Sequence, residues 1–437
     1  MSSERSEWAL EKCLEVLIDY RGKSPTKSKT GIPVISAKVV KNGRILEPVE
    51  QTIDPSYYEE WMRRGLPSVG DVVMTTEAPL GEVARLNART AQYALGQRIV
   101  TMRGRPGCLD NGYLKYLLLS DEMQDRLYRR ATGTTVQGIS QKALRQVELP
   151  LPDFDIQRAI AKILGDLDDK IDLMREINAT LEEMARTVFR TWFVDFEPVR
   201  AKATGATSFR GMPQELFETL PDSFQPSEIG DIPAGWSSKP LSDLIEVNPA
   251  RQLKKGVEAT YLGMTDVPTS GPAPANWAQR KFTSGMRFKN GDTLLARITP
   301  CLENGKTALV DFLDTGEIGW GSTEYIVLAP QGSASREFIY CLARSERFRE
   351  FAIKNMTGTS GRQRVGHESI SGYKMVDPGT EALQAFEQLS KPMFERITAN
   401  RDEISTLSAF RDTLLPKLIS GELDAPSLED LGLEGGE

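Results

Sequence analysis

YLKYLLLSDEMQDRLYRRATGT, from Tyr113 to Thr134, and FIYCLARSERFREFAIKNMTGT, from Phe338 to Thr359, are two copies of one pattern. They align without a gap, which places Ser120 on Ser345 and ends both copies on Thr-Gly-Thr. Each copy predicts an amphipathic helix that stops at a Gly-centred loop. A pattern that recurs so far along a chain indicates a repeated domain.

The repeat extends to both sides of this segment. Trp8 opens WALEKCLEVLID and Trp236 opens WSSKPLSDLIEV, while GDVVMTTEAPLGEVA from Gly70 corresponds to GDTLLARITPCLENGKTA from Gly291. The second pair of segments combines a Gly-Asp turn, an apolar run typical of a strand and a further turn at a proline. The sequence therefore predicts two related lobes of α/β (α+β) character.

A heptad pattern typical of a long helix follows each copy. After the first copy it comprises Ile160, Leu167, Met174, Leu181 and Val188, with Ile163, Ile177 and Met184 at the next heptad position and Leu164 and Ile171 beside them. After the second copy it comprises Phe386, Met393, Leu407 and Leu414, with Leu389, Phe410, Ile397, Ile404 and Leu418, and is interrupted by Arg396, Asn400 and Glu403. One such stripe is usually ordinary core packing, but two at equivalent places each need a partner.

We therefore predict that the two helices separate the lobes and pair as an antiparallel coiled coil, which would give the chain pseudo-two-fold symmetry. About 35 residues at 1.5 Å each span roughly 50 Å, more than one turn of B-DNA at about 34 Å. The predicted domains are a first lobe (1–153), a central helix (154–195), a linker (196–232), a second lobe (233–379), a distal helix (380–421) and an acidic tail (422–437).

The charges are segregated along the chain, although the formal net charge is −7. From Tyr20 to Arg44 there are seven cations and no acid, and from Arg126 to Arg145 five cations and no acid. Basic loops on an acidic frame are compatible with nucleic-acid binding at chosen surfaces. The four cysteines are isolated, and neither a secretory signal nor an apolar stretch of membrane-spanning length is present, so we expect a cytoplasmic protein with free thiols and no membrane partner.

Motifs for catalysis are absent or incomplete. Asn248-Pro249-Ala250-Arg251 lacks the second proline and the aromatic residue of an adenine-methyltransferase loop, and Gly22-Lys23-Ser24 lacks the first glycine of a phosphate-binding loop. Pro152-Asp153 with Asp168-Asp169-Lys170 mimics a metal-dependent nuclease, but Lys170 falls in the heptad helix. With His367 as the single histidine, neither a histidine triad nor a multi-histidine metal site can be built.

The chain resembles the specificity subunits of Type I restriction-modification systems over almost its full length. The resemblance rests on LPLPDFDIQRAIAKILGDLDDKID from Leu149, TLEEMARTVFRTWFVDFEPVRAKATG from Thr180, GMPQELFETLPDSF from Gly211 leading into IGDIPAGW, and the paired TGT and Ile-Ser segments. It implies two target-recognition domains that each read one half of a bipartite target in double-stranded DNA. It further implies that the helices act as spacer and as platform for two methyltransferase subunits, with two motor-nuclease subunits joining the restriction complex.

The resemblance also implies that this chain is a non-catalytic subunit without a cofactor of its own. S-adenosylmethionine, ATP and Mg are then expected on the partner subunits. Two alternatives stay open: a two-lobed protein-interaction scaffold that reads no sequence, and a specificity subunit whose restriction and methylation partner is one fused polypeptide.

The candidate site residues are DNA contacts, because Arg and Lys bind guanine edges and phosphates, Gln and Asn bind adenine, and Gly-rich loops let backbone amides approach phosphate. In the first lobe they are Lys23, Lys27, Lys29, Arg98, Arg129, Arg130, Thr134, Thr135 and Gln137. In the second lobe they are Arg251, Lys254, Lys255, Arg297, Thr359, Arg362, Gln363, Arg364 and His367.

Overall fold

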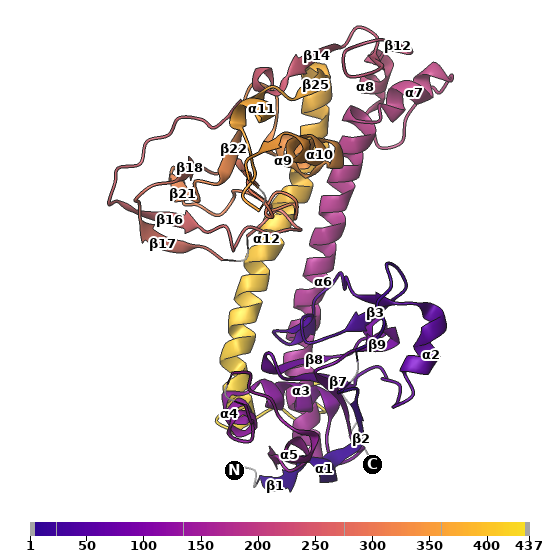
Figure 1. Ribbon diagram of the computed structural model, residues 1–437, viewed down its shortest axis with the longest axis vertical. Helices are drawn as coiled ribbons and strands as arrows, with labels where there is room; N and C mark the ends of the chain where they lie inside the picture. Colours follow the sequence, from indigo (N-terminus) through magenta and orange to yellow (C-terminus); the bar gives the residue numbers. More distant parts are fainter. Residues whose placement is uncertain (1–4, 23, 134, 275, 360, 433–437) are drawn as a thin grey trace. The chain divides into compact units, whose positions relative to one another are not determined.

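The computed structural model describes residues 5–432 except 23, 134, 275 and 360. The chain forms two compact units, unit 1 (Met1–Asp172 with Ser405–Glu437) and unit 2 (Leu173–Ile404). Each unit combines a lobe of helices and sheets with part of helix α6 (Phe154–Phe193) and part of helix α12 (Gly379–Ser420) (Figure 1). The predicted lobes of mixed character, present twice, are confirmed.

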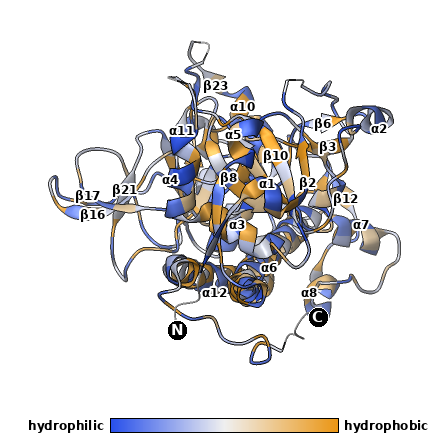
Figure 2. Cartoon of the chain, turned by 90° about the horizontal axis from the view of Figure 1, so that it is seen from below, coloured by the Kyte–Doolittle hydropathy of each residue, from blue (hydrophilic) through white to orange (hydrophobic). Residues whose placement is uncertain are grey.

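Unit 1 is built on an antiparallel sheet in the order β2-β10-β7-β8. Its strands are β2 (Leu14–Asp19), β10 (Ile99–Gly104), β7 (Val72–Thr76) and β8 (Leu80–Arg85). Every residue of β7 is buried, and β2 and β10 are largely apolar (Figure 2). The uninterrupted apolar run that predicted a strand after Gly70 therefore forms a strand covered on both faces.

Smaller elements complete unit 1. The strands are β1 (Ser6–Ala9), β3 (Ile32–Ile35), β4 (Val40–Lys41), β5 (Arg44–Ile45), β6 (Thr52–Ile53), β9 (Ala94–Leu95) and β11 (Glu148–Leu151). The helices are α1 (Leu10–Cys13), α2 (Tyr58–Trp61), α3 (Asn111–Leu119), α4 (Asp121–Arg129) and α5 (Gln141–Arg145), with short 3-10 turns at Pro55–Tyr57 and Thr90–Gln92. Strands β6, β3 and β9 form a second sheet in which β3 and β9 run parallel.

Unit 2 repeats this topology with an antiparallel sheet in the order β15-β22-β19-β20. Its strands are β15 (Ile245–Val247), β22 (Tyr325–Pro330), β19 (Thr293–Ala296) and β20 (Thr307–Leu309). The registers correspond as well: Val100 opposes Met74 in unit 1, and Ile326 opposes Leu295 in unit 2. The repeat read from the sequence is thus a repeat of strand order and of pairing.

The remaining elements of the second lobe follow the same plan. The strands are β14 (Ser237–Pro240), β16 (Glu258–Leu262), β17 (Ala278–Lys281), β18 (Met286–Phe288), β21 (Gly319–Gly321), β23 (Met356–Thr357), β24 (Arg364–Val365) and β25 (Lys374–Asp377). The helices are α9 (Arg336–Arg344), α10 (Glu346–Lys354) and α11 (His367–Ser371), with a 3-10 turn at Leu241–Asp243. Strands β16 and β21 run parallel, as β3 and β9 do.

The segment predicted as one amphipathic helix in each copy is a pair of helices. Ser120 separates α3 from α4 and Ser345 separates α9 from α10, and both serines have an extended backbone. The Ser120 hydroxyl accepts a hydrogen bond from the Met123 amide, as an N-cap residue does. A serine with this tendency to cap starts a new helix even within a continuous apolar pattern.

Helices α6 and α12 pack antiparallel within each unit, as predicted. In unit 1, Ile160 and Leu164 share a core with Leu418 and Ile419. In unit 2, the ring of Phe189 lies 6.1 Å from that of Phe386, between ring centroids. The best buried row of α6 contains Leu164, Ile171, Ala185 and Trp192. Helix α6 is therefore buried along a row of residues next to the predicted heptad row. The predicted heptad residues Met184 and Phe410 are exposed.

A polar pair interrupts the apolar contact of the helices in unit 2. Asn400, which breaks the heptad pattern in the sequence, is fully buried, and its Nδ2 donates to Oδ1 of Asn178 at 2.7 Å. The Asn178 amide in turn donates to the Ile397 carbonyl at 3.5 Å. An asparagine pair between two helices forms in one register only, so it fixes their alignment at some cost in stability. Part of that cost is Oδ1 of Asn400, which is buried without a hydrogen-bond partner among the described residues.

The predicted linker contains a folded subdomain. It includes α7 (Glu197–Ala203), α8 (Gln214–Thr219), β12 (Phe224–Gln225) and β13 (Ile232–Pro233). Phe196, Val199, Phe217, Leu220 and Ile232 form its core with Val376. The Lys202 ammonium donates to the carbonyls of Phe217, Glu218 and Leu220 and so caps the end of α8.

None of the helices in the described part of the chain combines the length and the hydropathy that a membrane span requires.

A buried acid on α6 links the lobe of unit 1 to both helices. Asp168 accepts hydrogen bonds from Lys115 at 2.5 Å, Tyr116 at 2.7 Å and Arg411 at 2.7 Å. We predict that Asp168→Ala lowers the free energy of unfolding by about 3–5 kcal/mol, because it leaves the buried Lys115 and the half-buried Arg411 without their shared counter-charge. Thermal unfolding followed by circular dichroism tests this, with the exposed Asp169→Ala as control. Equal melting temperatures for the two variants would contradict it.

The same cluster makes stability depend on pH. Burial opposes ionisation of Asp168, but Lys115, Arg411 and Tyr116 outweigh it and lower the pKa of the carboxyl. A depressed pKa stabilises the folded state above the unfolded value, about 3.9, and the contribution is lost as pH falls through the folded pKa. We expect the difference in unfolding free energy between the natural chain and Asp168→Asn to shrink on acidification. A difference that is constant from pH 7 to pH 3 would refute this.

Candidate nucleic-acid interface

Three segments of unit 1 meet at one end of the central sheet. The Thr76 amide at the end of β7 donates to the carbonyl of Arg98, which directly precedes β10, at 2.8 Å. The Thr76 carbonyl accepts from the amide of Ile139 at 3.0 Å, at the end of the loop that follows α4. Within that loop, Thr132 and Gly138 exchange backbone hydrogen bonds. We call the three segments around Thr76, Arg98 and Ile139 the loop frame of unit 1.

Unit 2 has the same loop frame. The Arg297 amide donates to the Glu324 carbonyl at 3.0 Å, and the Arg297 carbonyl accepts from the Val365 amide at 3.0 Å. Arg297, Glu324 and Val365 thus occupy the places of Thr76, Arg98 and Ile139. In both frames the turn that follows contains a cis proline, Pro79 or Pro300. The backbone is repeated while the side chains differ.

The frame of unit 1 gathers several of the predicted site residues. Arg98 is exposed and lies 3.0 Å from Glu77, between Nε and Oε1, and its φ of 63° is left-handed and unfavourable for an arginine. Thr135 and Gln137 are exposed on the loop closed by Thr132 and Gly138. Arg129 and Arg130, also exposed, end α4 directly before that loop.

The frame of unit 2 gathers others. Arg364 is 41% exposed and forms an ion pair with Glu324, which raises the pKa of the guanidinium. Thr359 and Arg362 are exposed in the turn of the β23–β24 hairpin, and Gln363 is half-buried. Arg297 is half-buried, and its Nε has no hydrogen-bond partner among the described residues.

The other predicted site residues lie on different segments. Lys27 and Lys29 are exposed in the loop between β2 and β3, and Lys254 and Lys255 are exposed before β16. His367 is exposed at the start of α11, with Nε2 at 3.3 Å from the Glu368 carboxylate. Lys23 and Thr134 lie outside the described residues.

Arg251, predicted as a DNA contact, has a partner within its own unit. Its side chain is buried, and both terminal nitrogens bond to the fully buried carboxylate of Asp292. Asp292 precedes β19, whereas the loop frame lies beyond the other end of that strand. Asp71 holds the equivalent place in unit 1 and is paired with Arg103 at 2.7 Å. The guanidinium therefore neutralises a core acid.

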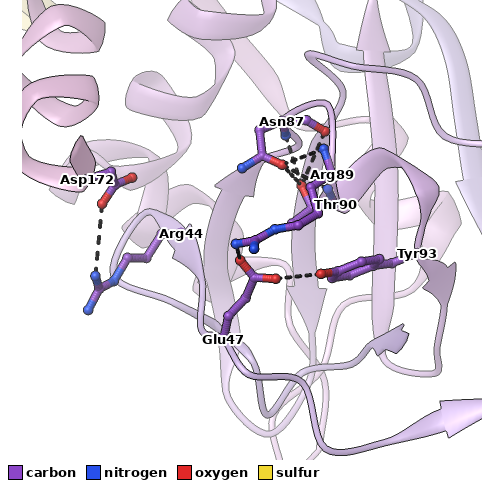
Figure 3. A network of polar contacts seen from close by, with 7 residues as sticks. All are labelled: Arg44, Glu47, Asn87, Arg89, Thr90, Tyr93 and Asp172. Atoms are coloured by element: carbon purple, nitrogen blue, oxygen red, sulfur yellow. Dashed lines mark hydrogen bonds and ion pairs between the residues drawn. The ribbon is translucent and has the colours of Figure 1, made fainter. Parts of the chain in front are cut away.

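Two further cations of the first basic segment also have partners inside unit 1. The Arg21 guanidinium bonds to Asp19 at 2.5 Å, and Arg44 lies 4.0 Å from Asp172 of α6 (Figure 3). Figure 3 also shows Glu47 accepting from Arg89 and from the Tyr93 hydroxyl, the latter at 2.5 Å. Part of the basic segment thus anchors the lobe, and Lys27, Lys29, Lys38 and Lys41 are exposed cations of the same segment.

Glu77 and Glu324 are the residues of the two frames that sequence reasoning missed. Acids are not expected on a surface that binds a polyanion, so both were passed over. One signal was present: in the repeat, Glu324 stands directly before its strand, as Arg98 does. An acid in place of a predicted contact residue would have drawn attention to the position.

The exposed side chains of these frames are of types suited to binding nucleic acid. Exposed guanidinium and amide groups on Gly-containing loops can bind phosphates and base edges. Among the described residues, no group of three or more His, Cys, Asp and Glu side chains has the arrangement of a metal site. Burial raises the pKa of the Cys13 thiol to about 12, with Cys108 contributing, so this thiol stays protonated at neutral pH.

The chain is similar to known specificity subunits of restriction enzymes. The family model of the Type I restriction modification DNA specificity domain matches residues 15–183. The chain is 25% identical over 440 residues to the MjaIX specificity subunit of Methanocaldococcus jannaschii, covering 97% of this chain and 95% of the relative. It is 24% identical over 366 residues to the HindI specificity subunit of Haemophilus influenzae, covering 71% of this chain and 77% of the relative.

A solved structure shares the fold. The Type I restriction-modification S subunit of M. genitalium superposes with a TM-score of 0.53 over 95% of this chain and 96% of its own, at 15% identity.

The assignment of Arg251 can be tested through stability. We predict that Arg251→Ala destabilises the chain by about 3–5 kcal/mol, because the fully buried Asp292 loses its partner. Chemical unfolding followed by fluorescence measures the change, and Lys254→Ala, an exposed cation nearby in sequence, serves as control. If both variants unfold like the natural chain, the structural role of Arg251 is wrong.

Proposed function

The chain belongs to the specificity subunits of Type I restriction-modification systems, and on that premise we propose that each lobe reads one half of a bipartite duplex DNA target. The observation that carries the proposal is the repeated loop frame. The backbone hydrogen bonds among Thr76, Arg98 and Ile139 in unit 1 are repeated in unit 2. There they join Arg297, Glu324 and Val365, and the side chain differs at each equivalent position. One scaffold with two sets of side chains suits two different half-sites.

Electrostatics supports DNA as the ligand despite the negative net charge. Exposed cations stand at both frames, Arg98, Arg129 and Arg130 in unit 1 and Arg362 and Arg364 in unit 2. Salt screens charge interactions beyond about 8–10 Å, so a DNA phosphate at a frame interacts more strongly with these nearby cations than with distant acidic residues. Lys27 and Lys29 add exposed positive charge that is suited to backbone contacts.

The helices are proposed to set the gap between the half-sites and to receive the partner subunits. Helices of 40 and 42 residues are about 60 Å long at 1.5 Å per residue, and one turn of B-DNA is about 34 Å. Leu173, Met184 and Phe410 leave 49–56% of their surface exposed on these helices, and exposed apolar side chains can contact a protein partner. We propose two methyltransferase subunits as these partners, joined by two motor-nuclease subunits in the restriction complex.

We propose that these partner subunits carry out the methylation and cleavage of DNA. S-adenosylmethionine, ATP and Mg would bind there, and this chain would act as the non-catalytic reader. A chain that methylates or cleaves DNA when purified alone would overturn this assignment.

Selection from a random duplex library tests the central claim. The full-length chain, assembled with its methyltransferase partner, is incubated with the library, and bound duplexes are sequenced. We expect two short motifs at a fixed separation. A scaffold that reads no sequence would enrich no motif.

The salt dependence of binding tests the lysine contacts. We predict that Lys27→Ala combined with Lys29→Ala lowers the slope of log affinity against log salt by about 0.9 for each phosphate contact removed, with little change in base preference. Lys12→Ala, an exposed lysine that precedes the opposite end of β2, should leave the slope unchanged. If the natural chain, the double variant and Lys12→Ala all have the same slope, Lys27 and Lys29 do not contact DNA phosphates.

A further inference from the structure

Each loop frame holds one arginine–glutamate pair. In unit 1, Arg98 precedes β10 and pairs with Glu77 at 3.0 Å. In unit 2, Glu324 takes the place of Arg98 before β22 and pairs with Arg364 at 2.7 Å. The position before the strand carries the base in unit 1 and the acid in unit 2, and its partner follows β7 in unit 1 but lies on β24 in unit 2. A pair formed from different segments in the two frames indicates that the pair itself is needed there.

The pair in unit 2 occupies one edge of the guanidinium. Nε of Arg364 donates to both carboxylate oxygens of Glu324 at 2.9 Å, and one terminal nitrogen donates to Oε1 at 2.7 Å. The other terminal nitrogen donates to the Arg362 carbonyl at 3.1 Å. Since a guanidinium has five N–H groups, one remains on each terminal nitrogen. Two such groups match the O6 and N7 acceptors that guanine presents in the major groove.

A contribution to folding stability does not explain why Glu324 is an acid. The Arg364 side chain is 41% exposed, and an ion pair this open contributes little to folding. An acid beside DNA also repels phosphate, so it weakens binding unless it has another use. Holding the guanidinium in one orientation is such a use, because it reduces the rotamer entropy that is lost on binding.

Two observations indicate that the frames are prepared for a ligand. Arg98 is held with a φ of 63°, a strained backbone that is typical of functional positions when it occurs in an arginine. Nε of Arg297 is buried without a hydrogen-bond partner among the described residues, and its backbone is held by Glu324 and Val365. A buried donor in this state is unfavourable until a ligand or water satisfies it.

Resting on the proposed function, we propose that Glu324 and Glu77 are positioning residues that orient Arg364 and Arg98 to read one guanine in each half of the DNA target. Each half-site then contains a G·C pair at the position that faces its frame. The glutamate touches the arginine and not the base.

The test measures base preference at single positions. Duplexes that carry the selected target with each base pair changed in turn compete for the full-length chain assembled with its methyltransferase partner. We expect the natural chain to prefer guanine at one position of the unit 2 half-site by about 5- to 150-fold, the range of a bidentate arginine contact. Arg364→Ala should abolish this preference and leave those at other positions intact.

Glu324→Gln is the decisive variant. The amide keeps the size of the side chain but replaces one acceptor oxygen by a donor that repels the guanidinium. We expect guanine to stay preferred with the preference reduced by about tenfold, and Glu324→Asp to restore part of it. Glu228→Gln is the matched control, since Glu228 is an exposed acid paired with Lys374 at 3.0 Å in the same unit. Glu77→Gln should act in the same way on the other half-site.

Four outcomes overturn the proposal. A changed preference at a cytosine would show that Glu324 reads the base directly. A lower melting temperature with unchanged base preference would show a structural role. If the natural chain discriminates bases but Glu324→Gln has no effect, the positioning role alone fails, whereas a natural chain without any base preference removes the proposed function as well.

Discussion

The burial of the apolar faces of α6 and α12 is the constraint on which the rest of the structure depends. A helix of 40 residues cannot cover such a face alone, and in both units it is covered by the other helix and by the lobe. Polar contacts then select the alignment: Asp168 binds Lys115 and Arg411 in unit 1, and Glu182 accepts from the Tyr340 hydroxyl at 2.7 Å in unit 2. These buried groups are satisfied in one arrangement, so each lobe is held on its part of the helices in a defined orientation.

In each lobe, the backbone of the loop frame is the same and its side chains are different. The hydrogen bonds from Thr76 and Arg297 are made by the main chain and therefore do not depend on which side chains the frame carries. The side chains are free to differ, and they do, even to the exchange of an arginine and a glutamate before the equivalent strand. A reader of two unlike half-sites needs this combination of a constant frame and variable contents.

Much of the fold could be predicted from the sequence because it depends on local pattern. The gapless repeat around Tyr113 and Phe338 identified the two lobes, and heptad spacing identified both helices. The burial of Leu164 and the exposure of Met184 could not be predicted from the sequence. Several rows of α6 are apolar, and which row is buried depends on how the lobes pack against the helix. The pairing of Arg251 with Asp292 could not be predicted because the two residues are distant in sequence, and Glu324 was missed because only the folded chain brings it to Arg364. Pairs formed by tertiary contact leave no local signal.

The central claim is that two lobes read two separate stretches of DNA for an enzyme that methylates it. A map of methylated adenines across the genome of cells that express the chain with its methyltransferase partner tests this most directly, with cells lacking the chain as reference. The account predicts methylation at one split motif, two short specified stretches with a constant number of unspecified bases between them. Methylation at a continuous motif, or a map that is unchanged when the chain is removed, would contradict it.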